Sequence, residues 1–242
     1  MSFTDLFAVM LVVALPLYGV WSWRRFRRRM EEGRPGTRLA MYGETIALEW
    51  SLVAILLVGW IMLEANPAGL GLTFETSRGS IATMVVALVL SGFLLSQVGS
   101  VRRMGESPDE RLVKQLASVE EMMPHDEGER AVFMTLSMTA GFCEELLFRG
   151  FLIEYFTPMT GLWGAVGSSA VIFGIAHSYQ GPAGMVKTGL VGLVMGALFL
   201  FSGSIWAAVI LHLALDIQGG LIGYEVFSRK KRQERVADVL AG

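Results

Sequence analysis

Long apolar runs dominate this sequence and restrict it to a membrane-spanning fold. Runs of about 18–20 residues recur along the 242-residue chain, and each can cross roughly 30 Å of hydrocarbon. The chain is 53% hydrophobic and only 17% charged. A helix satisfies its own backbone hydrogen bonds inside lipid. We therefore predict an all-α, polytopic transmembrane helical bundle of about seven spans, at residues 3–22, 45–64, 81–100, 131–156, 162–178, 185–202 and 205–223.

The basic residues are segregated between the predicted spans. They gather in the loop 23–39, in the segment 101–130, at Lys187 and in the C-terminal tail, which leaves only Arg78 and Arg149 elsewhere. The positive-inside rule then predicts an N-terminus outside and a C-terminus in the cytoplasm. In this setting the basic tail indicates topology, and no nucleic-acid partner is expected.

Four regions follow from this pattern. We predict a three-span support region at 1–100, a cytoplasmic loop at 101–130, a four-span catalytic core at 131–223 and a basic cytoplasmic tail at 224–242. Within the loop, apolar residues recur at helical spacing, which is typical of a short interfacial helix. These are Leu112, Leu116, Val119 and Met123.

Ionisable residues inside the late spans are the strongest functional signal. Each costs about 2.5–3.5 kcal/mol near the bilayer centre, so a group of them needs mutual pairing or a chemical role. Glu145 and Arg149 are four residues apart and can pair on one helix face. Glu144 is rotated by about 100° and remains without that partner. Such a carboxylate is suited to proton exchange, although both glutamates can also be purely structural.

Two histidines accompany these glutamates in other spans. His177 follows Phe173 by one turn, and His212 shares a helix face with Asp216. Taken singly, a histidine at this position is more often an interfacial or satisfied packing residue than a catalyst. Asp216 can orient the His212 imidazole or join it in binding a metal. Cys143 precedes Glu144, and we interpret it as a small packing residue, not as the nucleophile of a cysteine peptidase.

The three motifs, in this order and in successive late spans, resemble those of a known family. Glu144-Glu145-x-x-x-Arg149, Phe173-x-x-x-His177 and His212-x-x-x-Asp216 look like the motifs of the CAAX protease and bacteriocin-processing (CPBP, or Abi) family. That family includes the type II CAAX prenyl endopeptidases and consists of all-helical intramembrane peptidases.

The resemblance implies a role for each motif residue. Glu144, helped by His177, would activate the water that attacks the scissile carbonyl, and His212 with Asp216 would stabilise the oxyanion. Glu145 and Arg149 would hold the site together. The prenyl proteases have Asn where this chain has Asp216, and an ionised Asp would repel an oxyanion. Asp216 must then be protonated, orient His212 or bind a metal.

A zinc-dependent version of the peptidase is therefore a second hypothesis. Its ligands would be Glu144, His177, His212 and Asp216, which are donor types that suit zinc. The sequence has no His-Glu-x-x-His motif, so we favour catalysis without a cofactor.

These patterns predict an intramembrane endopeptidase that cleaves a membrane-associated or lipidated peptide or protein. We expect it in the plasma (inner) membrane of a prokaryote, with an active site accessible from the cytoplasm. Two alternatives belong to other classes: a non-catalytic membrane immunity or partner protein that keeps the fold, and a proton-coupled transporter. The sequence lacks the paired inverted halves that are typical of transporters.

Overall fold

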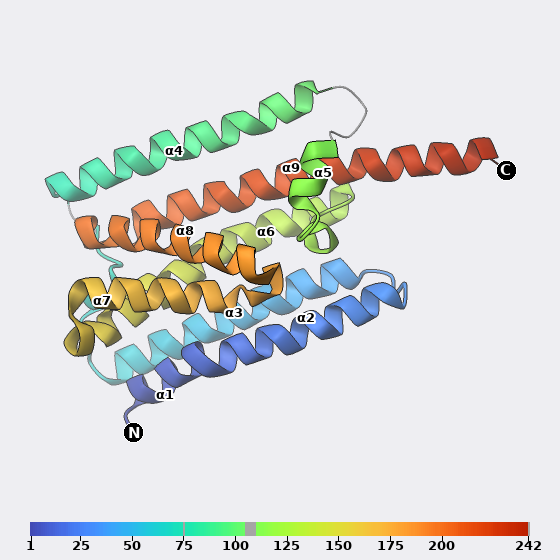
Figure 1. Cartoon of the computed structure of the whole chain (residues 1–242). Coiled ribbons are helices and arrows are strands. Elements are labelled where there is room, and N and C mark those ends of the chain that lie inside the picture. The colour runs from blue at the N-terminus through green and yellow to red at the C-terminus, as the bar shows by residue number, and fades with distance from the viewer. Residues whose placement is uncertain (75, 105–109, 242) are drawn as a thin grey trace.

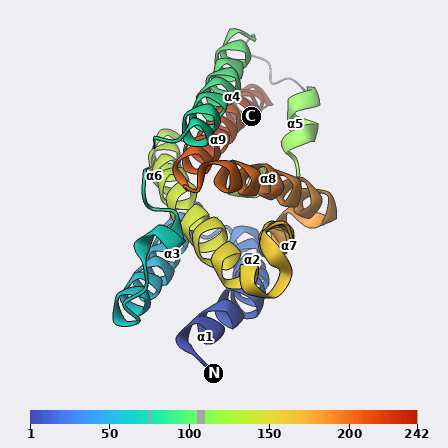
Figure 2. The same cartoon turned by 90° about the vertical axis from the view of Figure 1, so that its left-hand side faces the viewer.

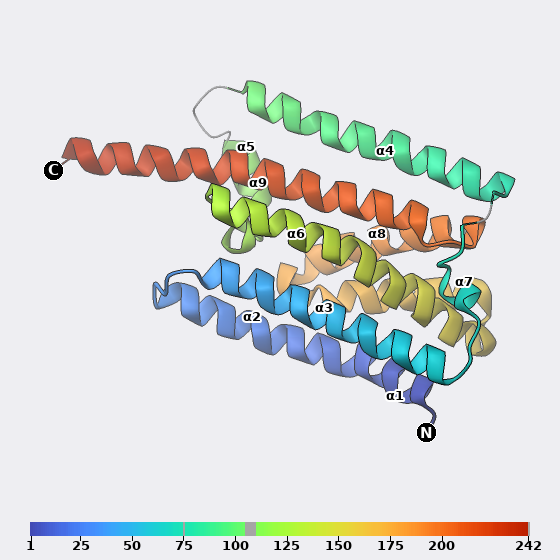
Figure 3. The same cartoon turned by 180° about the vertical axis from the view of Figure 1, so that it is seen from behind.

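The chain folds into a bundle of helices that run side by side (Figure 1). The computed structural model describes residues 1–74, 76–104 and 110–241, and every regular element in these ranges is a helix. Six of the described helical segments are long and apolar enough to cross a membrane. The two termini lie at opposite ends of the bundle (Figures 1 and 3). This confirms the all-α transmembrane bundle, whereas the side on which each terminus lies stays a prediction.

The elements follow one another along the chain with short connections. They are α1 (Phe3–Val9), the π-helical turn η1 (Met10–Ala14), α2 (Leu15–Glu31), α3 (Thr37–Met62), η2 (Pro67–Leu70), α4 (Arg78–Arg103), α5 (Glu110–Leu116), η3 (Glu120–Met122), α6 (Glu127–Glu144), the π-helical segment η4 (Glu145–Leu152), α7 (Ile153–Ala176), η5 (Ser178–Gln180), α8 (Gly181–Ser202) and α9 (Trp206–Ala241). Seen nearly along the helices, α1 and α3 lie toward one edge and α4 at the opposite edge, with α6, α8 and α9 between them (Figure 2).

The expected number of about seven spans is close to the six observed. The predicted spans 131–156 and 162–178 fall on one helical segment, Glu127–Ala176, except for the last two residues of the second span. Gly161 interrupts this segment with φ 70° and ψ 167°, a conformation that is essentially restricted to glycine. Ser169, beyond the break, donates a hydrogen bond to the Phe148 carbonyl at 2.7 Å. The chain therefore folds back at Gly161, and α7 packs along η4.

The first predicted loop is shorter than expected. We predicted a loop at 23–39, but α2 continues to Glu31 and α3 begins at Thr37. Arginine is a good helix former and is favoured near a helix C-terminus. The last turns of α2 are also held by ion pairs, with Arg25 bonded to Glu44 at 3.3 Å and Arg28 to Glu32 at 2.9 Å. The basic residues therefore extend the helix instead of ending it.

The predicted loop 101–130 contains the short helix α5, while its residues 105–109 lie outside the described part of the chain. Leu112, Leu116 and Val119 pack against a hydrophobic cluster that includes Tyr42, Met123, Phe133 and Phe227.

Residues 119–126, which we call the strap, cross this end of the bundle. The Tyr42 hydroxyl donates to the Met122 carbonyl at 2.7 Å, and Lys230 pairs with Glu120 at 2.7 Å.

Close helix contacts position the Phe173-x-x-x-His177 motif. At Gly174 an added Cβ would lie 2.7 Å from the Met185 carbonyl oxygen of α8. Small residues permit such a close approach between membrane helices, where packing drives association. The tight α7–α8 hairpin places the end of α7, and with it His177, against the interior of the bundle.

Candidate active site

The centre of the site is a buried ion pair at the start of η4. Arg149 donates from Nη1 to Glu145 Oε1 at 2.7 Å, and both side chains are fully buried. The Arg149 guanidinium also lies 4.2 Å from the centre of the Phe173 ring and reaches the Gly192 carbonyl at 3.4 Å. A desolvated cation on an aromatic face is stabilised by about 2 kcal/mol. The pair thus joins η4, α7 and α8 in the bundle interior.

Glu145 also orients His212. The Nδ1 atom of His212, on α9, lies 2.7 Å from the same Oε1 atom that binds Arg149. Because an ionised carboxylate only accepts hydrogen bonds, Nδ1 carries a hydrogen and donates a hydrogen bond to Glu145. Glu145 therefore holds Nδ1, and Asp216 approaches His212 at Nε2. The other ring atom, Nε2, is directed at the remaining acidic groups.

Glu144 meets both histidines through one oxygen atom. Its Oε2 lies 3.6 Å from His212 Nε2 and 3.9 Å from His177 Nε2. These separations exceed the 2.7–3.2 Å that is usual for a direct hydrogen bond. This oxygen is buried and forms no hydrogen bond with any residue that the structure describes. Glu144 ends α6, His177 directly follows α7 and His212 lies in α9, and their side chains converge on one point.

His177 is held by its own helix. Its Nδ1 lies 2.8 Å from the Phe173 carbonyl oxygen, and since a carbonyl only accepts, Nδ1 is the protonated nitrogen. The ring also stacks against Phe173 and Tyr179, with centroid distances of 4.6 Å and 5.6 Å. In the neutral ring, Nε2 is consequently an acceptor directed at Glu144. The Phe173-x-x-x-His177 spacing supplies both the carbonyl and the stacking partner.

Asp216 lies one turn beyond His212 on α9. Its Oδ2 is 3.7 Å from His212 Nε2, and its side chain is the most exposed member of the group at 36%. Asp216 therefore flanks the same ring nitrogen as Glu144. The structure brings together all six ionisable residues of the three motifs, while the role of each stays a prediction.

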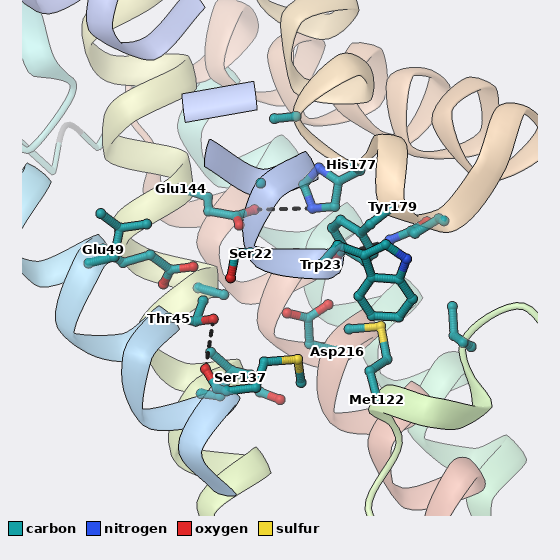
Figure 4. Close-up of a pocket in the computed structure, with 18 of the residues that line it drawn as sticks. Ser22, Trp23, Thr45, Glu49, Met122, Ser137, Glu144, His177, Tyr179 and Asp216 are labelled. Carbon is teal, nitrogen blue, oxygen red and sulfur yellow. Dashed lines mark hydrogen bonds and ion pairs between the residues drawn. The ribbon is translucent and has the colours of Figure 1, made fainter. Parts of the chain in front are cut away.

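A cavity of about 310 Å³ opens beside these residues. Glu144, His177, His212 and Asp216 all line it, together with α2, α3 and the strap. Figure 4 shows the Glu144 and Asp216 carboxylates within this cavity and His177 facing Glu144. Most of the remaining wall is apolar or aromatic: Leu15, Tyr18, Trp23, Phe26, Leu48, Leu52, Met122, Met123, Phe133, Leu136, Leu147, Phe148, Tyr179 and Leu215. The volume is that of a small-molecule or short-peptide site.

One carboxylate of the cavity was missed at the sequence level. Glu49, on α3, lines the same cavity and is only 7% exposed. The predicted span 45–64 placed it near a membrane surface, where a charge is readily solvated. Because α3 begins at Thr37 instead, Glu49 lies near the middle of the helix. The signal that identifies it is a lone ionisable residue deep in an apolar helix.

Two other hypotheses for this site concern Cys143 as a nucleophile and a bound zinc ion. Cys143 is fully buried in the hydrophobic core and does not line the cavity. Among the described residues, no group of three or more His, Cys, Asp or Glu side chains has the arrangement of a metal site. Zinc binding by Glu144, His177, His212 and Asp216 stays a prediction.

The comparison with known families agrees with this geometry. Residues 127–218 match the profile of the type II CAAX prenyl endopeptidase Rce1-like family. This segment contains all three motifs. The chain is therefore similar to this family over residues 127–218. No curated protein and no solved structure matches the chain. This match and the six long apolar helices together indicate an integral membrane protein.

Proposed function

We propose that this CAAX protease relative is an intramembrane endopeptidase in which Glu144 activates the attacking water. The observation that carries the proposal is the convergence of two imidazole Nε2 atoms on Glu144 Oε2, at 3.6 Å and 3.9 Å, inside a cavity. Atoms at these separations leave room for a water molecule that contacts all three groups, because each contact needs about 2.8 Å. The same arrangement places the Glu144 carboxylate and the two imidazoles, as base and as carriers of protons, within reach of one reacting atom.

The chemistry follows the requirements of amide hydrolysis. Glu144 accepts a proton from the water while the oxygen attacks the scissile carbonyl, and His177 Nε2 accepts a hydrogen bond from the same water. The tetrahedral intermediate then collapses, the C–N bond breaks, and the proton taken by Glu144 passes to the leaving nitrogen. The products are a carboxylate and an amine. General acid–base catalysis of this kind contributes roughly 10²–10⁴-fold in rate.

His212 is placed to stabilise the oxyanion. When its Nε2 is protonated, the ring donates toward the cavity and carries a positive charge, which the Glu145 carboxylate at Nδ1 stabilises. Asp216, 3.7 Å from Nε2, adds a second donor only in its protonated form. In this scheme Glu145 and Arg149 act through His212 and are positioning residues.

The cavity also supports a substrate held at the membrane. Its apolar wall suits a lipidated or membrane-associated peptide, which is the substrate class we propose. The cavity extends from the histidines to Met122 and Met123 of the strap, at the end of the bundle that carries the basic α2 terminus. By the positive-inside rule this end faces the cytoplasm, so substrate would enter from that side of a prokaryotic plasma membrane.

A purified-protein assay tests the proposal. We expect the wild-type chain in detergent micelles to cleave a farnesylated Cys-aliphatic-aliphatic-X peptide, with the two products identified by mass. Glu144→Ala should abolish cleavage, and metal analysis of the same preparation should find no stoichiometric zinc. Stoichiometric zinc with chelator-sensitive activity would favour the metal-dependent version. Absence of cleavage, with Glu144→Ala behaving as wild type in cells, would favour a non-catalytic partner protein.

A further inference from the structure

Glu49 is the acidic residue of the cavity that the proposed reaction does not use. It lies in α3, outside the matched segment 127–218, and its side chain is more than nine-tenths buried. Its Oε2 atom is buried and has no hydrogen-bond partner among the described residues, and none of the ion pairs found there includes Glu49. Burying a polar group without a partner costs several kcal/mol, and an unpaired charge costs more. An ionised Glu49 would be stabilised by a cation that the described residues do not supply.

The surroundings of Glu49 define what that partner is. The cavity contains the carboxylates of Glu49, Glu144 and Asp216, and within the described residues its lining includes neither Lys nor Arg. Arg149, the buried cation of the first motif, is already paired with Glu145. Figure 4 shows the Glu49 carboxylate directed into the cavity from the side opposite His177. Glu144 and Asp216 face the imidazoles of His177 and His212, whereas Glu49 pairs with no cation among the described residues.

We propose that Glu49 binds a cationic side chain of the substrate, an ammonium or a guanidinium group. The inference rests on the proposed peptidase function and names a specificity subsite within it. The apolar part of the wall suits the aliphatic stem of Lys or Arg. A substrate cation beside Glu49 would fix the position of the peptide relative to Glu144. The substrate is then a membrane-associated peptide with a basic residue close to the scissile bond.

A different role for Glu49, as a proton relay to Glu144, makes a different prediction. A relay acts on every substrate alike, because the proton it carries comes from the water. A cationic subsite acts only on substrates that carry the cation. The two roles are separated by comparing two substrates that differ in one charge.

The experiment starts from a peptide library, with and without a farnesyl group, digested by the purified full chain. The cleaved sequences are read by mass spectrometry. We expect Lys or Arg to be enriched at one position near the scissile bond. The best Lys peptide is then compared with its norleucine counterpart, which has a similar stem and no charge. We expect wild type to prefer the Lys peptide by about tenfold to a hundredfold in kcat/KM, as is typical of a buried charge pair.

The variant Glu49→Gln should cleave both peptides at the norleucine rate. Glu44→Gln is the matched control, since Glu44 lies in the same helix but pairs with Arg25 and Arg29 at the surface. It should keep the preference for Lys. A wild type without any preference, or a Glu49→Gln variant that slows both peptides equally, would overturn the cationic subsite.

Failure of the peptidase function would be visible separately, as a wild type that cleaves no member of the library. In that case binding tests the subsite directly, through the change in tryptophan fluorescence on adding acetyl-Leu-Lys-Leu-amide or its norleucine analogue. Tighter binding of the Lys peptide that Glu49→Gln removes would support the subsite. Equal binding of the two peptides to the wild type would refute it.

Discussion

The buried pair of Glu145 and Arg149 gives the most quantitative prediction of the structure. In Arg149→Met the Glu145 carboxylate remains fully buried and loses the cation at 2.7 Å. Removing one partner of a buried ion pair destabilises a protein by about 3–5 kcal/mol, because an uncompensated charge is left behind. The contact with the Phe173 ring disappears at the same time. We expect the free energy of unfolding to fall by about 3–5 kcal/mol.

The double variant Glu145→Met/Arg149→Met separates charge burial from packing. Replacing both partners by apolar side chains is often neutral, so the loss of the pair itself should have little effect. What remains is the unpartnered His212 Nδ1, which we expect to cost about 1–3 kcal/mol. The double variant should therefore be more stable than Arg149→Met alone, although inactive because His212 is no longer oriented.

Both variants are measured by titrating mixed micelles with SDS while following tryptophan fluorescence, with Arg149→Lys as a control that keeps the charge. The reasoning would be refuted by an Arg149→Met loss below about 1 kcal/mol, or by a double variant no more stable than the single one.

Three further predictions concern other parts of the molecule. Gly174→Ala should destabilise the fold by about 1–3 kcal/mol through overpacking, because its Cβ would lie 2.7 Å from a carbonyl oxygen of α8. The control Gly189→Ala, whose Cβ would have its nearest contact at 3.5 Å, should have little effect. Equal unfolding free energies for the two variants would contradict this prediction. Asp216→Asn should keep peptidase activity within about tenfold, since an amide can donate to an oxyanion, while Asp216→Leu should lose about 10²–10³-fold; equal losses would argue against oxyanion donation. Burial and the nearby charge of Arg38 lower the pKa of His125 below its ordinary 6.5. The unfolded chain then binds more protons, so the unfolding free energy should fall as pH drops below about 6.5, and His125→Phe should lack this component in SDS titrations at several pH values.

The sequence predicts the contacts that lie within one helix. The four-residue spacing of Glu145 and Arg149 places them on one face, and the structure joins them at 2.7 Å. Phe173 and His177 are likewise one turn apart, and their ring centroids lie 4.6 Å from each other. Contacts of this kind depend only on helix geometry, and that geometry is known before the fold.

Contacts between helices were not predictable in the same way. The bond from His212 to Glu145 joins α9 to η4, and it depends on how the two helices pack and on the π-helical turn itself. The place of Glu49 depended on where α3 begins, eight residues before the predicted start of the span. Helix boundaries are the least reliable part of a prediction from sequence, because helix ends are weakly marked.

The proposal that Glu144 is the base which activates water is tested most directly by comparing Glu144→Gln with Glu154→Gln. The first variant keeps the size and the hydrogen-bonding shape of the side chain at the meeting point of His177 and His212. The second makes the same change at an exposed glutamate one helical segment away. The measurement is the rate at which each purified protein cleaves the farnesylated peptide at saturating concentration. We expect Glu144→Gln to lower kcat by about 10²–10⁴-fold and Glu154→Gln to leave it unchanged. A Glu144→Gln variant that cleaves at the wild-type rate would contradict the role of Glu144.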